Sequence, residues 1–399
     1  MEHLAHRINR RLAAAIAFAA VVAMATTGAA TASASTGATQ VPPLSPSTAW
    51  SLTAIDARIQ RQVEMILSQQ RASGAILHGS GGVNVYFGNS AALGLVAEGS
   101  SRSLAAAERW HDWVMERLNR APDAQGASFT SYDYAIRSGE EVATQGYDSV
   151  DSYAATTLSV AAALWRSGDP HVRADIASRA ADYRGIAALL VSPVPTGVRK
   201  TSGLTQATVR YNIGYTMDNA EVYEGLADGA ALFTGLGLET DAARLRAAAG
   251  ASRAAILGTL WNPAAQTWNV YDRSAANLGG AFYPAGMAQY FPLIHGVVDA
   301  HDPRVIASWA HLTTRWPGWT QNLLNRGEAA TPMAYAAVAL GHADGARAML
   351  DDIAARYAPA WRYPTGCDAT QCQWWSPSQA GWTIRTLLLL RRQTEPVVQ

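Results

Sequence analysis

Two short stretches of the sequence place pairs of carboxylates at the start of nearly uncharged helical segments. The first, YDSVDSYAATTL, carries Asp148 and Asp151, and the second, TMDNAEVYEGL, repeats the arrangement with Asp218 and Glu221. Carboxyl groups crowded into one pocket raise one another's proton affinity, so one can serve as an acid while another serves as a base. We therefore take Asp151 and Asp218 as the leading catalytic candidates, with Asp148 and Glu221 in reserve.

Helix capping is the competing explanation for the same four residues. Asp148 and Asp218 are well placed as N-caps, with Asp151 and Glu221 three residues on as capping-box partners. The helix dipole favours negative charge at this end and lowers the pKa of a carboxyl group there. Such a group needs a second carboxylate close by before it can hold a proton, which favours pairs over single residues. Glu224, one turn deeper, also fits a hydrogen-bonded core role.

Three more carboxylates lie near predicted helix starts or in predicted loops. Glu328 precedes the segment AATPMAYAAVALG and is retained as a catalytic candidate. Asp133 in SYDYAIR and Asp368 in CDATQC fall in loops. For these two we favour contacts at the rim of a site, or Asx turns that shape the loop.

Aromatic residues supply flat surfaces on which the apolar face of a sugar can stack. The chain has 13 tryptophans and 15 tyrosines. Tryptophans at core spacing within helices are expected to pack, whereas those in long loops can line a cleft or cap the core. The predicted substrate-binding residues are Tyr147, Tyr153, Arg210, Tyr211, Trp261, Trp268, Tyr271, Trp374 and Trp375. Among them Arg210 is the group that could hold an acidic substituent of the substrate.

The sequence predicts no metal site and no cofactor. Its histidines are scattered without HxxxH or HExxH spacing. Cys367 and Cys372 enclose a short loop that an oxidising compartment would let close as a disulfide. Closing so short a ring stabilises a fold by about 2 kcal/mol, so its main effect would be to shape the loop.

Helical apolar spacing and cap signals recur along the whole chain. The predicted helices cover residues 53–72, 87–98, 103–119, 148–165, 173–191, 217–235, 239–258, 284–296, 302–315, 329–341, 343–356 and 377–391. Segments that are small and apolar all round alternate with segments that carry a charged stripe. Because a helix that is apolar all round is buried and a striped one lies at the surface, buried and surface helices must alternate.

The connections between these helices are also unequal. Links from a buried helix to the next surface helix are short, whereas the return links at 120–147, 192–216, 259–283 and 357–376 are long enough to be functional. Parallel buried helices would gather every long loop on one face, over their N-terminal ends. We therefore predict an all-α (α/α)6 toroid of six inner and six outer helices, with short β-hairpins in the loops of the cleft face. LWNPAAQTWNVYD, residues 260–272, is the clearest hairpin, and residues 199–215 are a weaker candidate.

This combination resembles the six-hairpin glycosidase superfamily. Twelve alternating helices, acidic residues that open the inner ones and a hairpin bracketed by Trp261 and Trp268 carry the resemblance, which covers the mature chain and points to no particular family. It implies cleavage of glycosidic bonds by two carboxyl groups, about 6.5–9.5 Å apart for inversion and about 5–5.5 Å apart for retention. Unsaturated-uronyl hydrolases are similar in placing two essential aspartates near successive inner-helix starts, as with Asp151 and Asp218.

The N-terminus resembles an export signal. Basic residues precede the apolar run 12–25 and a small-residue cleavage site, so we expect a signal peptide at 1–34, a leader at 35–50 and a single domain at 51–399. No later apolar run is long enough to anchor the chain in a membrane. The net charge is zero, without a basic face for nucleic acid. We expect a secreted, extracellular monomer.

Together these features predict a secreted glycoside hydrolase that cleaves an oligo- or polysaccharide by carboxylate acid/base catalysis, by the inverting route. One alternative is β-elimination of a uronate polymer, for which RYNIGY offers Arg210, Tyr211 and Asn212. Another is a non-catalytic carbohydrate-binding protein on the same scaffold. Unsaturated products absorbing in the ultraviolet indicate a lyase, new reducing ends indicate a hydrolase, and binding without turnover indicates neither.

Overall fold

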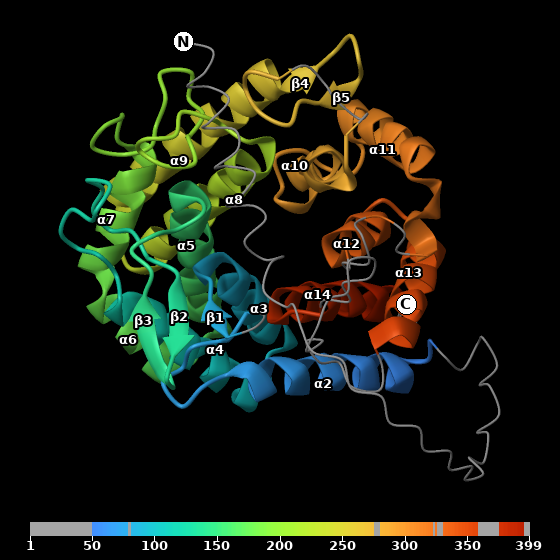
Figure 1. Cartoon of the computed structure of the whole chain (residues 1–399), viewed down its shortest axis with the longest axis horizontal. Helices are drawn as coiled ribbons and strands as arrows, with labels where there is room; N and C mark the ends of the chain where they lie inside the picture. Colours follow the sequence, from blue (N-terminus) through green and yellow to red (C-terminus); the bar gives the residue numbers. More distant parts are fainter. Residues whose placement is uncertain are drawn as a thin grey trace, which may run out of the picture.

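The helices form a closed double ring in the computed structural model, which describes residues 50–78, 81–274, 280–321, 324, 330–357 and 375–394 (Figure 1). The inner ring consists of α3 (Val85–Glu98), α5 (Val150–Ser167), α8 (Thr216–Gly235), α10 (Phe291–Ile294), α12 (Thr331–Ala339) and α14 (Pro377–Thr394). The outer ring consists of α2 (Leu52–Gln69), α4 (Ser101–Glu116), α6 (Pro170–Ser178), α7 (Ala180–Val191), α9 (Glu239–Ala255), α11 (Pro303–Arg315) and α13 (Ala343–Tyr357). Each inner helix packs on the next, and α14 packs back on α3. The predicted (α/α)6 toroid is confirmed.

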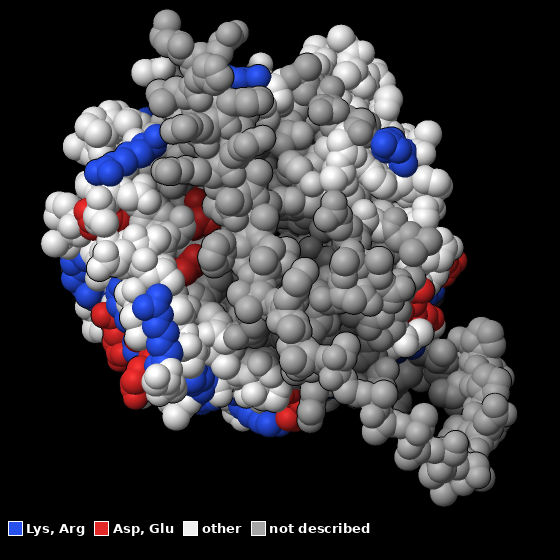
Figure 2. Space-filling view, viewed as in Figure 1, with Lys and Arg blue, Asp and Glu red and all other residues white. Residues whose placement is uncertain are grey.

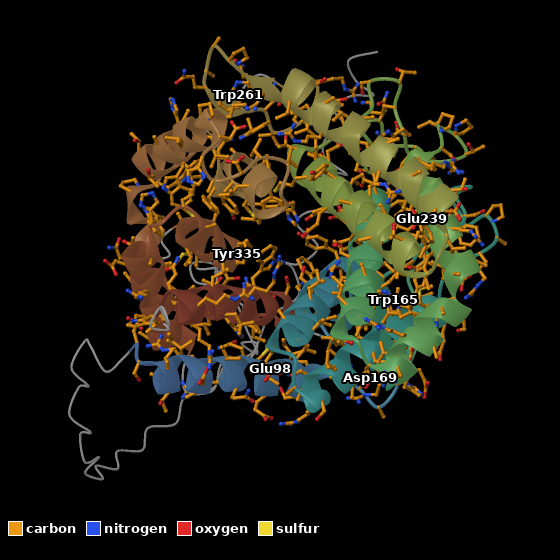
Figure 3. The ribbon with its side chains drawn as sticks, turned by 180° about the vertical axis from the view of Figure 1, so that it is seen from behind. Glu98, Trp165, Asp169, Glu239, Trp261 and Tyr335 are labelled. Atoms are coloured by element: carbon orange, nitrogen blue, oxygen red, sulfur yellow. The ribbon has the colours of Figure 1, made fainter. Side chains whose placement is uncertain are left out.

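Burial follows the predicted alternation of helix character. In α5 the residues from Val150 to Leu164 are all buried, whereas the outer helix α11 buries one stripe that includes Val305, Trp309 and Leu312. Seen from behind, the links from inner to outer helices are short (Figure 3): residues 99–100, 168–169, 236–238 and 340–342. The long return loops therefore collect at the opposite end of the inner helices.

Two predicted helices differ in detail. The segment 173–191 is two helices, α6 and α7, which meet at Arg179. The segment 284–296 is three short pieces: the π-turn η2 (Phe282–Gly286), the 3-10 turn η3 (Met287–Gln289) and the four-residue α10. Pro284 and Pro292 lack the backbone N–H that a continuous helix requires, so the fourth inner position is irregular.

The described parts of the loops form two small sheets. The predicted hairpin is confirmed, because β4 (Trp261–Asn262) pairs antiparallel with β5 (Thr267–Trp268). A second sheet, β1 (Gly82–Val83), β2 (Tyr134–Arg137) and β3 (Glu140–Ala143), was not expected. Its turn at Ser138 and Gly139 has φ of 51° and 89°, the left-handed pair that a tight two-residue hairpin needs. Residues 199–215 contribute only isolated bridges.

The ring closes where α14 meets α3. A Cβ added to Gly381 would lie 2.3 Å from the carbonyl oxygen of Ser90, and one added to Gly94 would lie 2.4 Å from Cα of Gly381. The two backbones therefore touch at a pair of glycines, which is the closest approach that two helices can make. Larger side chains at these positions would hold the first and last inner helices apart.

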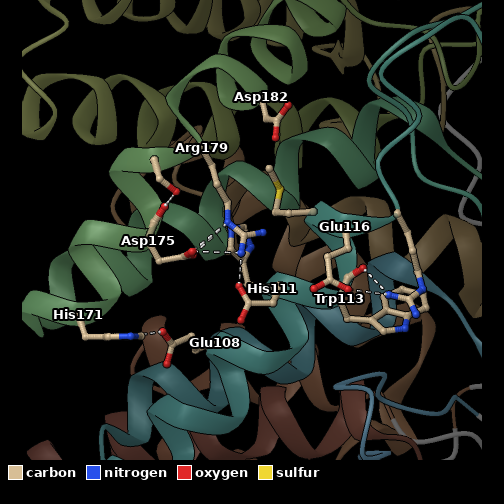
Figure 4. A network of polar contacts seen from close by, with 12 residues as sticks. Glu108, His111, Trp113, Glu116, His171, Asp175, Arg179 and Asp182 are labelled. Carbon is tan, nitrogen blue, oxygen red and sulfur yellow. Dashed lines mark hydrogen bonds and ion pairs between the residues drawn. The ribbon is translucent and has the colours of Figure 1, made fainter.

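Ion pairs tie the outer helices α4, α6 and α7 together (Figure 4). Arg179 lies 2.6 Å from Asp112 and 3.0 Å from Asp175, and His171 contacts Glu108 at 3.2 Å. Beneath them, His111 and the hydroxyl of Tyr183 are 2.7 Å apart in the core. This network belongs to the outside of the ring, away from the long loops.

Several predicted features fall outside the described residues. These are the signal peptide and nearly all of the leader, Glu328, Asp368, Trp374, Cys367 and Cys372. The last leader residue, Trp50, is described and packs with the domain, since its indole Nε1 donates to Asp351 at 3.0 Å. Within the described ranges, the helices are too short or too polar to cross a membrane.

Candidate active site

The starts of α5 and α8 bring Asp151 and Asp218 together, as the sequence predicted. Ser149 Oγ lies 2.6 Å from Asp151 Oδ1 and 2.9 Å from Asp218 Oδ2. Asp151 is fully buried and also accepts hydrogen bonds from the Thr205 hydroxyl at 2.6 Å and the Ser152 amide at 3.0 Å. Asp218 is partly exposed on the loop-bearing face, where Figure 2 shows acidic side chains left of centre and basic ones towards the rim.

The shared hydroxyl indicates where a proton resides. A serine hydroxyl donates one hydrogen, so it cannot donate to two ionised carboxylates at once. Asp151 already accepts from three donors, which suits an anion. The second contact is satisfied when Asp218 is protonated and donates to Ser149, which in turn donates to Asp151. The arrangement therefore fits a chain in which a protonated Asp218 donates to Ser149 and Ser149 donates to Asp151.

The electrostatics agree with this assignment. Burial, followed by the charges of Asp151 and Glu221, raises the pKa of Asp218 well above its ordinary value. Burial also raises the pKa of Asp151, and the hydrogen bonds from Ser149, Thr205 and Ser152 oppose that rise. Crowded carboxyl groups cannot all ionise together, so the least hydrogen-bonded one keeps its proton.

Glu221 completes the group one turn further along α8. It is 3% exposed, and its two oxygens accept from the hydroxyls of Tyr86 and Ser152, each at 2.6 Å. Burial raises the pKa of Glu221 above its ordinary value, although the charge of His295 and these hydrogen bonds act in the opposite direction. Glu221 thus joins α3, α5 and α8 beneath Asp218.

His295 and Glu224 lie deeper in the ring. His295 Nδ1 is 2.5 Å from Glu224 Oε2, and its Nε2 faces Glu221 Oε1 at 4.0 Å. Burial acts to raise the pKa of Glu224, but the charge and hydrogen bond of His295 outweigh it, and the pKa is lowered. The hydrogen-bonded core role considered for Glu224 fits this pairing.

Asp148 lies beside a different carboxylate, Asp133. The Tyr153 hydroxyl donates to Asp133 Oδ1 at 2.9 Å and accepts from the Asn84 side chain at 2.5 Å and, at 3.4 Å, the Asp148 amide. Burial, helped by the charge of Asp148, raises the pKa of Asp133 to about 7. The Asp148 side chain is exposed, although the surrounding protein still raises its pKa by desolvation. Asp133 is thus more than the rim residue we expected.

The capping explanation for Asp148 and Asp218 is wrong. The N-cap residues of α5 and α8 are Ser149 and Tyr215, and neither makes a side-chain cap hydrogen bond. Ser149 uses its hydroxyl for the two aspartates instead. Asp151 and Glu221 do not form capping boxes either. They accept hydrogen bonds from the side chains of Thr205 and Tyr86, which belong to other segments.

Three of the aromatic residues that we predicted to contact the substrate, Tyr153, Trp268 and Trp375, are buried. Trp268 and Trp375 are fully buried, so neither ring offers a face to a sugar, and the Trp375 indole donates to Gln62 at 3.0 Å. Tyr153 is 3% exposed and its hydroxyl serves Asp133. Trp261 is partly exposed and packs edge to face on Trp268 at the outer rim of the ring (Figure 3), and its predicted contact with substrate stays a prediction. These residues hold the loops in place.

The other predicted contacts remain accessible. Arg210 is exposed, and Tyr147, Tyr211 and Tyr271 are partly exposed. The hydroxyls of Tyr211 and Tyr215 are 3.2 Å apart, and the Tyr271 ring meets Tyr215 edge to face at 5.9 Å. Among the described residues no cluster of His, Cys, Asp and Glu has the form of a metal site.

Residues that the sequence alone did not indicate complete the site. Tyr86, Ser149, Thr205 and His295 hold the acidic group together. Only Ser149 carried a local signal, as the polar one of the two residues between Asp148 and Asp151. The others come from distant helices and loops and become neighbours only when the ring closes.

Comparisons with known proteins identify the architecture. No protein-family model matches the chain, and no curated protein matches it in sequence. A glycosidase variant solved in complex with glucose superposes with a TM-score of 0.61 at 13% identity, covering 89% of this chain and 100% of that one. A GH63 mannosylglycerate hydrolase from Thermus thermophilus, also with glucose, gives 0.54 at 14% identity over 84% and 99%.

A sugar epimerase from a ruminal bacterium gives a TM-score of 0.50 at 11% identity, covering 87% of this chain and 100% of that one. At such low identities the likeness establishes the fold and not the reaction. The chain therefore has the toroid architecture found in these glycosidases, as the sequence resemblance predicted.

Proposed function

We propose that the protein is a glycoside hydrolase whose acid is Asp218. The observation that carries the proposal is the hydrogen-bonded chain from Asp218 through Ser149 to the buried Asp151, at the inner-helix starts of a toroid shared with glycosidases. A carboxyl group that stays protonated near neutral pH is what the leaving oxygen of a glycosidic bond requires.

The Asp151–Asp218 pair does not suit the inverting roles that we first gave it. Both carboxylates contact one hydroxyl, so their facing oxygens are closer than the roughly 6.5 Å or more that admits a nucleophilic water. Asp151 is also fully buried. We therefore assign Asp151 to positioning, and we propose Asp148, exposed at the other carboxylate pair, as the base.

In the proposed reaction Asp218 gives its proton to the glycosidic oxygen as the bond from the anomeric carbon to that oxygen breaks. A water molecule bonds to the anomeric carbon from the opposite face, and its proton passes to Asp148. The products are a sugar with inverted anomeric configuration and the released alcohol. Exchange of protons with solvent returns Asp148 to its anion and Asp218 to its acid, so the cycle is balanced.

Asp218→Asn and Asp148→Asn test the assignment on a panel of oligo- and polysaccharides. Each variant is expected to lose at least 100-fold in kcat, the usual contribution of a general acid or base. Asp344→Asn is the matched control, because the Asp344 side chain is 97% exposed at the start of an outer helix. NMR of the first-formed product reports the anomeric configuration, and retention would exclude the inverting route.

The same assay separates the alternatives. Ultraviolet absorbance from an unsaturated product of uronate polymers would replace the proposal with a lyase, for which Arg210 and Tyr211 remain available. Saccharide binding without turnover would make the protein a carbohydrate-binding one. Equal activity of the wild type and both aspartate variants would remove Asp218 and Asp148 from the mechanism.

We also propose that the protein is exported and acts outside the cell as a monomer. The support is its N-terminal sequence, with basic residues before the apolar run 12–25. Fractionation of the producing cells, with N-terminal sequencing of the mature chain, tests this. A cell-retained chain that keeps its first residues would contradict it.

A further inference from the structure

Arg385 on α14 is a cation that two aromatic rings hold in place. Its guanidinium carbon lies 4.1 Å from the ring centroid of Trp382, three residues earlier on α14, and 5.1 Å from that of Tyr335 on α12. The two rings meet edge to face, with centroids 5.5 Å apart. Within the described residues this guanidinium makes no hydrogen bond and no ion pair. Arg166 on α5, by contrast, lies 2.8 Å from the carboxylate of Asp228.

The stacked arrangement leaves the hydrogen-bond donors of Arg385 available. A guanidinium presents its flat faces to aromatic rings, whereas its N–H groups point outward in its own plane. The rings therefore fix the orientation of the group without using its donors. Arg385 and Tyr335 are both partly exposed. Because outer helices cover the outward sides of α12 and α14, the exposed parts face the middle of the ring, where Figure 3 shows Tyr335.

His295 connects the surroundings of Arg385 to the acidic group. It follows α10 and reaches α8 and α14, which lie on opposite sides of the inner ring (Figure 1). Its Nδ1 is 2.5 Å from Glu224 on α8, and its ring meets that of Trp382 edge to face, with centroids 6.0 Å apart. Arg385 therefore lies across the ring, near the level of Glu224. At 1.5 Å per residue, Glu224 is roughly 9 Å below Asp218 along α8.

We propose that Arg385 binds a carboxylate of the saccharide, so that the substrate is an acidic sugar. The inference rests on the proposed function, which makes the ligand a saccharide and Asp218 its acid. A guanidinium and a carboxylate form two parallel N–H···O hydrogen bonds, a geometry that a neutral sugar hydroxyl cannot reproduce. Since Arg385 lies near the level of Glu224 and not at the rim, the carboxylate belongs to a sugar close to the bond that is cut.

The local charge favours a carboxylate over a phosphate. Burial acts to raise the pKa of Glu224, but the charge and hydrogen bond of His295, followed by the charge of Arg385, lower it. Glu224 is thus an anion at neutral pH. A phosphate monoester carries a charge of about −1.5 to −2 at pH 7 and would add more negative charge beside Glu224 than the guanidinium balances. A carboxylate adds a single charge.

Equilibrium binding at pH 7 tests the proposal directly. Glucuronic, galacturonic and mannuronic acids are titrated beside glucose, galactose and mannose, from which they differ only at C6. At least one acid is expected to bind the wild type about 10-fold or more tightly than its neutral counterpart, the usual contribution of hydrogen bonds between charged groups. Arg385→Gln should remove this preference and leave the affinity for the neutral sugar unchanged. Tighter binding of glucose 6-phosphate than of every uronic acid would overturn the assignment to a carboxylate.

Three further variants make the test specific. Arg392→Gln is the matched control, because it removes the same charge from an exposed position on α14 and should keep the preference. Arg385→Lys keeps the charge without the planar fork, so the preference should fall several-fold, and this variant decides the matter where Arg385→Gln does not fold. Arg210→Gln examines the residue that the sequence predicted for an acidic substituent.

Loss of the preference in Arg210→Gln, with its retention in Arg385→Gln, would move the carboxylate to the exposed loop and overturn the inference. So would a wild type that prefers none of the three acids, or an equal loss in Arg392→Gln.

Binding and turnover keep this inference separate from the proposed function. A preference for a uronic acid that depends on Arg385, without cleavage of any saccharide in the panel, would remove the hydrolase and keep the carboxylate site. Turnover of a neutral oligosaccharide by a protein that lacks the preference would keep the hydrolase and remove the site. With a uronate-containing substrate, ultraviolet absorbance of the product distinguishes elimination from hydrolysis.

Discussion

At the scale of single residues, the site has fewer hydroxyl hydrogens than carboxylate oxygens that could accept them. Ser149 has one hydrogen for two carboxylates, and Glu221 is satisfied by the hydroxyls of Tyr86 and Ser152. Asp218 is left as the member with the least support for a negative charge. Because Asp218 has few donors to stabilise a negative charge, loss of its proton must weaken the folded state.

Asp218→Asn should therefore stabilise the protein at neutral and higher pH. A carboxyl group whose folded pKa is raised contributes stability that is full below its unfolded pKa and is lost as pH rises through the folded pKa. The amide cannot ionise, so its stability avoids that loss. We expect Tm to rise by a few degrees at pH 8 and to change little at pH 4, as measured by calorimetry across this range. A lower Tm at pH 8 would contradict the assignment.

At the scale of helices, close packing through small residues holds the inner ring together. α3 and α14 approach at Gly94 and Gly381, and α8 approaches α5 at Gly225, where an added Cβ would lie 2.5 Å from the Ala155 carbonyl oxygen. The alanine- and glycine-rich composition therefore has a specific geometric use. Each of these contacts is between backbones, which cannot move aside as a flexible side chain can.

Gly381→Ala is expected to destabilise the fold by about 1–3 kcal/mol, the usual cost of overpacking a tight interface. Gly250→Ala is its opposite control. Gly250 lies in the outer helix α9 and a Cβ there meets no atom within 4 Å, so alanine should stabilise by roughly 0.5–1 kcal/mol through helix propensity. Urea unfolding of both variants measures the difference. Similar effects of the two substitutions would contradict the packing argument.

Helix character was predictable because it depends on local patterns. The apolar segments AATTLSVAAALW and VYEGLADGAALF are inner helices, and their spacing places Asp151 and Asp218 at neighbouring starts. The β2–β3 hairpin was missed although Ser138–Gly139 is a turn signal between alternating residues. The apolar spacing of residues 284–296 predicted one helix in spite of Pro284 and Pro292, and the structure has three short pieces between Phe282 and Ile294.

The contacts between segments were not predictable from the sequence. Thr205 carries no local signal, and its contact with Asp151 depends on a loop that reaches α5 only in the finished ring. The prediction that Trp268 and Trp375 line a cleft was wrong for a related reason, because both are fully buried in the core. A residue type indicates what chemistry is available, whereas burial decides whether a ligand can reach it.

At the scale of the whole molecule, the toroid is completed by its last helix. α14 packs on α3, α2 and α12 and so joins both ends of the ring. Its residues Trp382, Ile384 and Leu387 are buried among these neighbours. Without α14 the apolar sides of three other helices would face water, and the loss of burial would exceed the marginal stability of a domain.

A chain that ends at residue 376 should therefore fail to unfold cooperatively. We expect no sharp thermal transition and increased binding of a hydrophobic dye, compared with the full chain under the same conditions. Circular dichroism and calorimetry measure both properties. A truncated chain with a cooperative transition near that of the full chain would show that the ring is stable while open.

The glycine contact between α3 and α14 also sets an order of events during biosynthesis. α3 leaves the ribosome long before α14 has been translated, so for most of synthesis its partner does not exist. The ring therefore cannot close before α14 has left the ribosome, and until then the side of α3 that packs on α14 lacks its partner.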